Sequence, residues 1–98
     1  VVDRTDGFGK PFSSPGPAGP ATVTPGFLAY FEIVEKLANG ELDVQRWDDA
    51  TLTPYAYSTK TGLWVTYDDE KSLRYKVSYL IEKELGGAMT WAIDLDKF

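Results

Sequence analysis

Apolar side chains recur with the period of an α-helix in two separate stretches of the chain. The first predicts a helix that starts at Thr24-Pro25, because Thr is a good N-cap and Pro is tolerated at the first helical position. Asn39-Gly40 should end this helix, since both residues accept a left-handed conformation. Its apolar face carries, at helical spacing, Leu28, Phe31, Val34 and Leu37.

The period then changes to two. Residues 43–48 alternate as a strand does, and residues 52–57 and 63–67 are rich in Thr, Tyr, Val and Trp. A polar turn that contains Gly62 joins the last two stretches. The pattern predicts a hairpin and, with the earlier strand, a small antiparallel sheet beside the helix.

The second helical stretch begins at Asp68-Asp69, whose negative charges suit a helix N-terminus, and should end at Gly86-Gly87. Glu70 and Arg74 make a favourable i,i+4 pair. One face is apolar and contains Leu73, Val77, Leu80 and Ile81. The almost wholly apolar run that follows, residues 88–93, predicts a buried parallel strand covered on both faces. One such unit cannot close a barrel, so we expect this chain to be the end of something larger.

Alternation along the predicted final strand puts Met89, Trp91 and Ile93 on one face. Trp91 then lies near the strand's C-terminal end, where a barrel places its ligand pocket. The other interpretation is a ring that only fills a core, as large aromatics usually do. Asp94 and Asp96 lie on one side and resemble a glycosidase acid–base pair, but we favour two solvated acids.

Other polar and aromatic groups also allow two interpretations. Asp68-Asp69 suits a metal or catalytic pair, although helix capping is a sufficient reason for it. Five aromatics suit either a sugar-stacking platform or cross-strand pairs within the sheet, namely Tyr30, Trp47, Tyr55, Tyr57 and Trp64.

The start of the chain has a different composition. Residues 1–24 hold four of the six prolines, which rules out a long helix or a central strand there. We expect an ordered surface loop pinned by Phe8 and Phe12. The opening residues have no apolar core of a signal peptide, so the chain is expected to be mature or cut from a longer protein.

Composition excludes several chemistries. The 98 residues contain no Cys and no His, which removes thiolate chemistry, disulfides and the usual zinc sites. We therefore expect no metal and no cofactor. The net charge is −5 with acids and bases mixed, which argues against nucleic acid and an anionic membrane as partners. No apolar run approaches the roughly 20 residues that span a bilayer.

The segment PGFLAYFEI, the Trp/Tyr-rich hairpin and GLWVTYDDEKSLRYKVSYLIEKELGGAMTWAIDLDKF together resemble the C-terminal part of family 18 glycoside hydrolases, the chitinases. The resemblance implies an α+β fragment of a (β/α)₈ barrel. Residues 1–67 would be most of the family's insertion domain, and residues 68–98 the last helix and strand of the barrel. It also implies a secreted protein that acts on β-1,4-linked N-acetylglucosamine polymers.

The resemblance assigns roles to two residues. Trp91 matches the Trp that stacks under the reacting sugar, and Phe27 matches an apolar position in the insertion-domain wall of the cleft. Thr24 stands where several relatives carry a cleft Glu. The family's catalytic Glu ends a D-x-x-D-x-D-x-E motif, which this chain lacks, so we expect no catalytic residue here and no activity of the chain alone.

Three hypotheses remain open at this point. In the leading one, the chain is a piece of a chitinase and forms part of the wall of the substrate cleft. Its partners would be the remainder of the barrel and chitin or a chitooligosaccharide. The second is a non-catalytic, lectin-like chitin-binding homologue. The third is an interaction module without a sugar ligand. Without its neighbours, the final strand should leave Met89, Trp91 and Ile93 exposed, which favours self-association.

Overall fold

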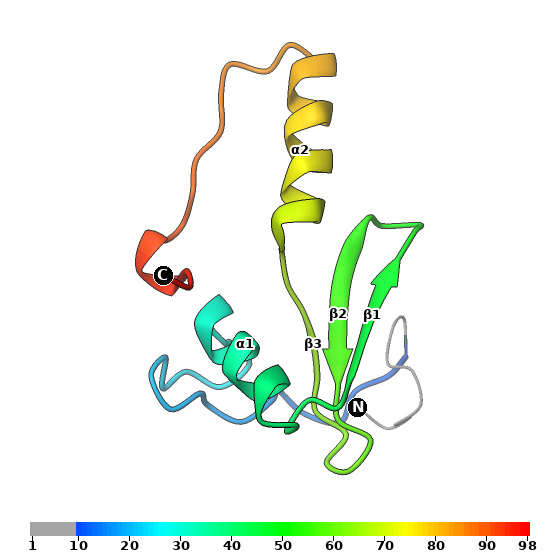
Figure 1. The fold of residues 1–98 in the computed structure, drawn as a ribbon, viewed down its shortest axis with the longest axis vertical. Helices are drawn as coiled ribbons and strands as arrows, with labels where there is room; N and C mark the ends of the chain where they lie inside the picture. Colours follow the sequence, from blue (N-terminus) through cyan, green and yellow to red (C-terminus); the bar gives the residue numbers. More distant parts are fainter. Residues whose placement is uncertain (1–9) are drawn as a thin grey trace.

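A computed structural model describes residues 10–98 of the chain and shows a mixed α and β arrangement (Figure 1). The elements are, in order, α1 (Tyr30–Ala38), β1 (Val44–Asp48), β2 (Thr53–Tyr57), β3 (Trp64–Thr66), α2 (Glu70–Glu82) and the short 3₁₀ helix η1 (Ile93–Leu95). Figure 1 shows α1 and the lower part of the sheet at one end, with α2 rising away from them. None of the described helices is long and apolar enough to cross a membrane.

The predicted sheet is confirmed. Its three strands are antiparallel in the order β1-β2-β3, and Tyr57 of β2 pairs with both Val44 of β1 and Trp64 of β3. The turn between β2 and β3 is closed by the Ser58 N–H, which donates to the Leu63 carbonyl at 2.9 Å. Gly62 has a φ of 77° in this turn, a conformation that Gly adopts at little cost.

The core lies between α1 and the sheet. Three buried residues form its centre, namely Ile33 of α1, Leu42 of the loop before β1 and Ala56 of β2. Partly buried apolar side chains pack around this centre, namely Leu28, Leu37, Leu63, Val65 and Tyr67. Two positions of the predicted apolar face, Leu28 and Leu37, therefore contact the core as expected.

Helix α1 begins later than predicted, at Tyr30 with Ala29 as its N-cap. Thr24-Pro25 instead opens a tight turn, in which the Phe27 N–H donates to the Thr24 carbonyl at 3.2 Å and Gly26 has a φ of 83°. Pro followed by Gly at the two central positions is typical of a type II turn, and this local preference prevails over the start of a helix. The predicted end is confirmed, with Asn39 as the C-cap.

Helix α2 begins as predicted, with Asp69 as its N-cap, but ends at Glu82 rather than at Gly86-Gly87. Glu84 has a φ of 53°, and the Leu85 N–H reaches the Leu80 carbonyl at 3.1 Å. This is the arrangement of a Schellman motif, in which a residue in the left-handed region ends the helix. The prediction was wrong because it assigned that conformation to the nearest glycines.

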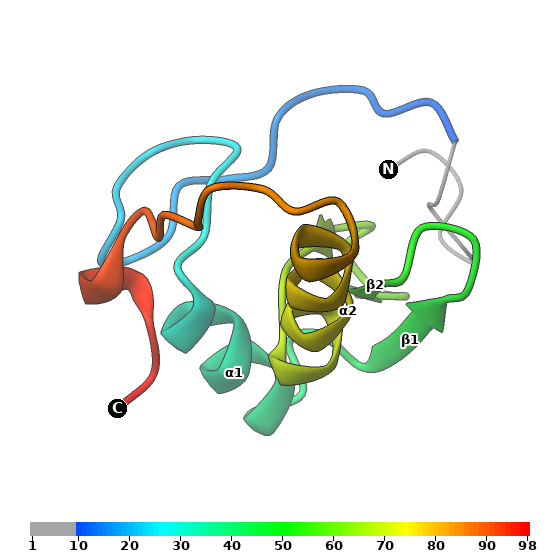
Figure 2. The same cartoon turned by 90° about the horizontal axis from the view of Figure 1, so that it is seen from above.

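The strand predicted over residues 88–93 is not formed in this structure. The described chain is irregular there and ends in η1, and Figures 1 and 2 show it beside α1, away from the sheet. A parallel strand bonds through its backbone to neighbouring strands, and the sheet of the described residues is wholly antiparallel. Without such neighbours, the apolar run lacks the backbone partners that a strand requires.

The loop before α1 also differs from its prediction. Phe12 was expected to pin it, but its side chain is exposed. Phe8 lies outside the described residues. The loop is instead fixed by backbone hydrogen bonds, such as the one from the Gly26 N–H to the Gly16 carbonyl at 2.9 Å.

Candidate functional site

Trp91 borders a groove of about 990 Å³ between α1, α2 and the C-terminal segment. One wall is the start of α1 with Tyr30 and Ile33, and another is the face of α2 that carries Leu73 and Val77. The C-terminal segment closes the third side with residues 89–93. The indole of Trp91 is 86% exposed, so it is free to receive a flat apolar ligand face.

The apolar side chains of this region lie largely uncovered. The predicted exposure of Met89, Trp91 and Ile93 is confirmed, although an irregular segment and the start of η1 present them, and not a strand. Leu73, Val77 and Ile81 on the predicted apolar face of α2 are exposed as well. A helix with one apolar face normally buries that face against another element, so this surface is shaped for contact.

Phe27 is the second predicted site residue. It lies in the turn before α1, and its ring is 70% exposed. Phe27 does not belong to the lining of the groove that Trp91 borders, so the structure does not bring the two rings into one pocket. Phe27 and Trp91 are nevertheless both exposed to solvent.

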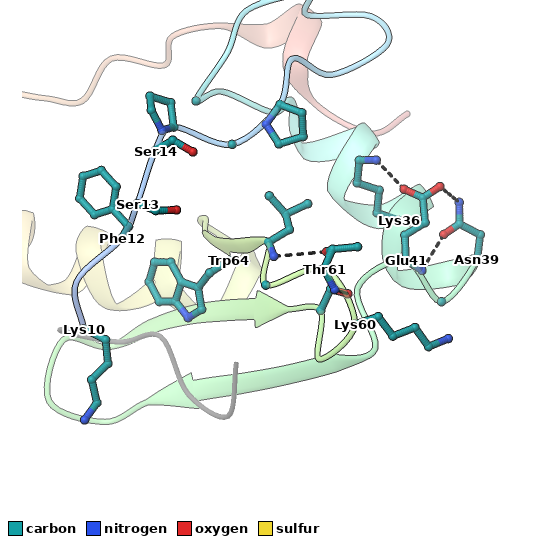
Figure 3. Close-up of a pocket in the computed structure, with 18 residues that line it drawn as sticks. Lys10, Phe12, Ser13, Ser14, Lys36, Asn39, Glu41, Lys60, Thr61 and Trp64 are labelled. Carbon is teal, nitrogen blue, oxygen red and sulfur yellow. Dashed lines mark hydrogen bonds and ion pairs between the residues drawn. The ribbon is translucent and has the colours of Figure 1, made fainter. Parts of the chain in front are cut away.

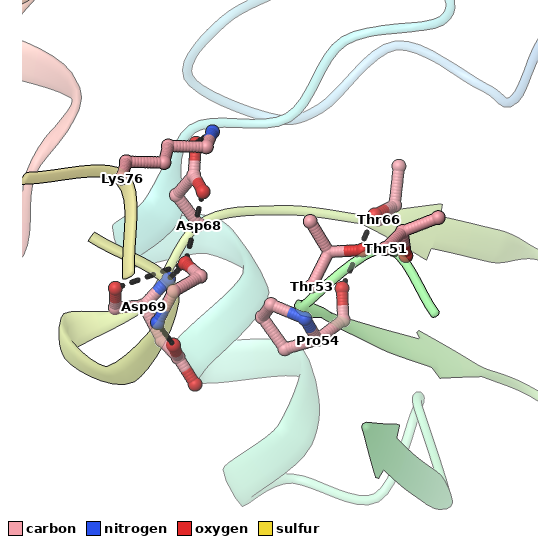
Figure 4. A network of polar contacts seen from close by, with 8 residues as sticks. Thr51, Thr53, Pro54, Thr66, Asp68, Asp69 and Lys76 are labelled. Carbon is pink, nitrogen blue, oxygen red and sulfur yellow. Dashed lines mark hydrogen bonds and ion pairs between the residues drawn. The ribbon is translucent and has the colours of Figure 1, made fainter. Parts of the chain in front are cut away.

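Asp68 and Asp69 cap α2, as the structural interpretation predicted (Figure 4). Asp69 Oδ1 accepts from the Ser72 N–H at 2.8 Å, and Asp68 Oδ1 accepts from the Ser72 hydroxyl at 2.9 Å. Lys76 pairs with the other Asp68 oxygen at 2.7 Å. Both carboxylates are thus engaged in holding the helix start, and residues 10–98 contain no group of acids arranged to hold a metal ion.

The aromatic residues of the sheet pack within β2, across to β3 and against α2. Tyr55 and Tyr57 are buried, and the Tyr55 ring lies 5.6 Å from that of Trp64 and 6.4 Å from that of Tyr57, centroid to centroid. Trp47 packs on Tyr75 of α2 at 6.1 Å, with the Lys71 ammonium 3.8 Å from its ring centroid. Buried rings offer no stacking surface, so Tyr55 and Tyr57 cannot take part in a sugar platform.

A second depression, of about 1250 Å³, lies between the N-terminal loop and the turn after β2 (Figure 3). Figure 3 shows Phe12 and Trp64 at one end of it and Lys36, Asn39 and Glu41 at the other. Glu41 accepts from Lys36 at 2.6 Å and from Asn39 at 3.1 Å. These bonds hold the acid's pKa below its ordinary value and keep it engaged with the end of α1.

Glu32 is a functional candidate that the sequence analysis missed. Its carboxylate is buried and accepts three backbone N–H groups, from Ala29 at 2.7 Å, Ala21 at 2.8 Å and Thr22 at 3.1 Å. Burial raises the pKa of Glu32, but these hydrogen bonds outweigh it and lower the pKa below its ordinary value. The usual signature, Ser or Thr three residues before Glu, is absent because the N-cap is Ala29.

Comparison with known proteins identifies the class. Residues 4–96 match the model for glycosyl hydrolases family 18. The chain is 48% identical over 90 residues to human Chitinase-3-like protein 2, a match that covers 92% of this chain and 22% of that protein. It is 39% identical over 93 residues to Chitotriosidase-1 of Mus musculus, covering 95% of this chain and 18% of that protein.

A bacterial relative agrees with these two. Chitinase B of Serratia marcescens is 41% identical over 70 residues, which is 70% of this chain and 14% of that protein. The protein is therefore a glycosyl hydrolase homologue. More closely, it belongs to family 18, and the chain spans about a fifth or less of the length of these relatives.

Proposed function

We propose that this chain is the C-terminal part of a chitinase-type glycosyl hydrolase whose ligand is a polymer of β-1,4-linked N-acetylglucosamine. The observation that carries the proposal is the 86% exposed indole of Trp91 at the edge of a groove, in a chain whose relatives are named chitinases. The apolar CH face of a pyranose ring can stack on such an indole.

Residues 1–67 would form the insertion domain of the longer protein, and residues 68–98 its last helix and strand. The distribution of buried side chains supports this division. The core lies in α1 and the sheet, whereas the apolar face of α2 and the segment after it remain uncovered. In a barrel those surfaces would face neighbouring helices and strands, and residues 88–93 would find the backbone partners that they lack here.

In this arrangement the chain binds and orients sugar and does not cleave it. Trp91 would stack under the reacting sugar and Phe27 would form part of the cleft wall. The D-x-x-D-x-D-x-E motif is absent from the 98 residues, so the acid that protonates the glycosidic oxygen would come from another part of the protein. Because such a polymer is met outside the cell, we propose that the protein is secreted.

Titration of the chain with an N-acetylglucosamine tetramer, followed by tryptophan fluorescence, tests the binding role. The ligand should change the emission of the wild-type chain and of a Trp47→Phe control, in which another of the three Trp residues is replaced. Trp91→Phe should lose most of the change. An equal response in Trp91→Phe would contradict the assignment, and a glucose tetramer tests the need for the acetamido group.

The alternative is a non-catalytic chitin-binding homologue. It is favoured by the chain's high identity to a protein named Chitinase-3-like, a name that marks likeness to a chitinase. Sequencing of the transcript that encodes this chain distinguishes the two. A Glu at the end of an upstream D-x-x-D-x-D-x-E motif supports the enzyme, and another residue at that position supports the binding protein.

A further inference from the structure

Glu32 connects two segments that lie apart in the sequence. Its Oε2 accepts the N–H of Ala29, at the start of α1, and its Oε1 accepts the N–H groups of Ala21 and Thr22. These donors lie at the two ends of the loop of residues 21–29, which carries Phe27 two residues before its end. One carboxylate with 1% exposure thus closes the loop from inside.

Hydrogen bonds hold the first part of this loop, whereas at its end Leu28 packs against the core and Ala29 is buried. Val23 and Phe27 are exposed, so neither side chain anchors the loop in the core. The remaining links are polar, such as the bond from the Val23 N–H to the Gly19 carbonyl at 2.9 Å and the contact of the Thr22 hydroxyl with the Phe27 carbonyl at 3.4 Å. Charged acceptors make stronger hydrogen bonds than neutral ones, so the Glu32 carboxylate is a principal restraint on the loop.

The backbone fits closely around this carboxylate. A Cβ added at Gly19 would lie 2.5 Å from Glu32 Oε1, closer than real Cβ atoms approach another heavy atom. Gly19 is itself buried. The absence of a side chain at this position therefore lets the loop come against the acid.

We infer that Glu32 is a positioning residue, which holds the loop of residues 21–29 so that Phe27 is presented to the sugar ligand. This inference rests on the proposed function, because that function makes Phe27 a wall of the sugar cleft. Glu32 itself touches no ligand. Its loss should leave three buried or partly buried N–H groups without an acceptor, and the loop should then move Phe27 away from its binding position.

A double-mutant cycle in the longer protein that contains these 98 residues tests this inference, with the affinity for an N-acetylglucosamine tetramer as the readout. Glu32→Gln and Phe27→Ala should each weaken binding, by about the same factor. If Glu32 acts through Phe27, the double variant should bind no more weakly than Phe27→Ala alone. The matched control is Glu35→Gln, which removes the same charge from an exposed position of the same helix and should leave the affinity unchanged.

Amide hydrogen exchange supplies an independent readout. In Glu32→Gln one acceptor oxygen becomes an NH2 donor, so exchange should rise at least tenfold either at Ala29 or at Ala21 and Thr22 together, while exchange within the sheet stays as in the wild type. Gly19→Ala serves as a second variant in case Glu32→Gln unfolds. It keeps the acid but pushes its carboxylate away from the Ala21 and Thr22 N–H groups, and should lower the affinity to the same degree.

The outcomes separate the two claims. Unchanged affinity and exchange in Glu32→Gln would overturn the positioning role alone, as would strictly additive losses in the double variant. Unchanged affinity in Phe27→Ala, or no binding by the wild-type longer protein, would refute the proposed contact of Phe27 and overturn the role of Glu32 with it.

Discussion

Two alanine substitutions, one in each helix, should change the free energy of unfolding of this chain by very different amounts. Ile33 of α1 is 2% exposed and belongs to the core cluster. Replacing a buried Ile by Ala removes apolar contacts and leaves a cavity, which costs about 2–5 kcal/mol. Because the core is small, Ile33→Ala should remove much of the free energy of unfolding.

Val77 of α2 is 49% exposed, so only about half of its side chain leaves water on folding. Full burial of the two carbons that Val77→Ala removes would contribute about 1.6 kcal/mol at ~0.8 per carbon, and half of that is about 0.8 kcal/mol. The higher helix propensity of Ala returns about 0.5 kcal/mol. The net change in the free energy of unfolding should therefore lie within about 0.5 kcal/mol of zero.

Urea unfolding followed by far-ultraviolet circular dichroism measures both changes. The chain should be kept dilute and the midpoint checked at several concentrations, because the exposed face of α2 favours self-association. A cost above about 1.5 kcal/mol for Val77→Ala in the dilute chain would refute the reasoning, since it would require a covered side chain. In the longer protein, where we propose that this face is buried, the same substitution should be clearly destabilising.

Three further predictions follow from the caps and the exposed indole. The pKa of Glu32 in the folded chain is lowered from its ordinary value of 4.5, so its carboxylate stabilises the fold above about pH 4.5. This contribution is lost as the pH falls through the lower pKa of the folded state. The melting temperature of Glu32→Gln should accordingly vary less with pH in the acid range, and equal slopes would contradict this. Asp69→Ala removes the N-cap of α2 and should lower the helical circular dichroism signal, at a cost of about 1 kcal/mol, whereas exposed Asp94→Ala should have no such effect. Trp91→Ala should change the urea midpoint hardly at all, because the ring is 86% exposed, and a clear loss of stability would show that the indole is packed.

The turns and caps show how local information can both succeed and fail. Asp69 and Gly62 were predicted correctly, because a helix cap and a tight turn depend on residues adjacent in sequence. Thr24-Pro25 misled the prediction for a similar reason. Pro is tolerated at a helix start, but Pro followed by Gly is typical of a type II turn, and that local preference prevailed.

The candidate site was only partly predictable. Trp91 and Phe27 were identified from a family resemblance, and their exposure agrees with a binding role without testing it. Glu32 was missed because its donors at Ala21 and Thr22 lie ten or more residues away, across a loop whose path the sequence pattern does not give.

The sequence by itself determined the end of the first helix, the antiparallel sheet and the start of the second helix, since periodicity and capping are properties of short segments. Only the tertiary structure decided what happens after α2. The apolar run of residues 88–93 has the composition of a buried strand, yet it stays irregular in this chain. A strand is completed by hydrogen bonds to its neighbours, so its formation depends on partners that its own residues cannot supply.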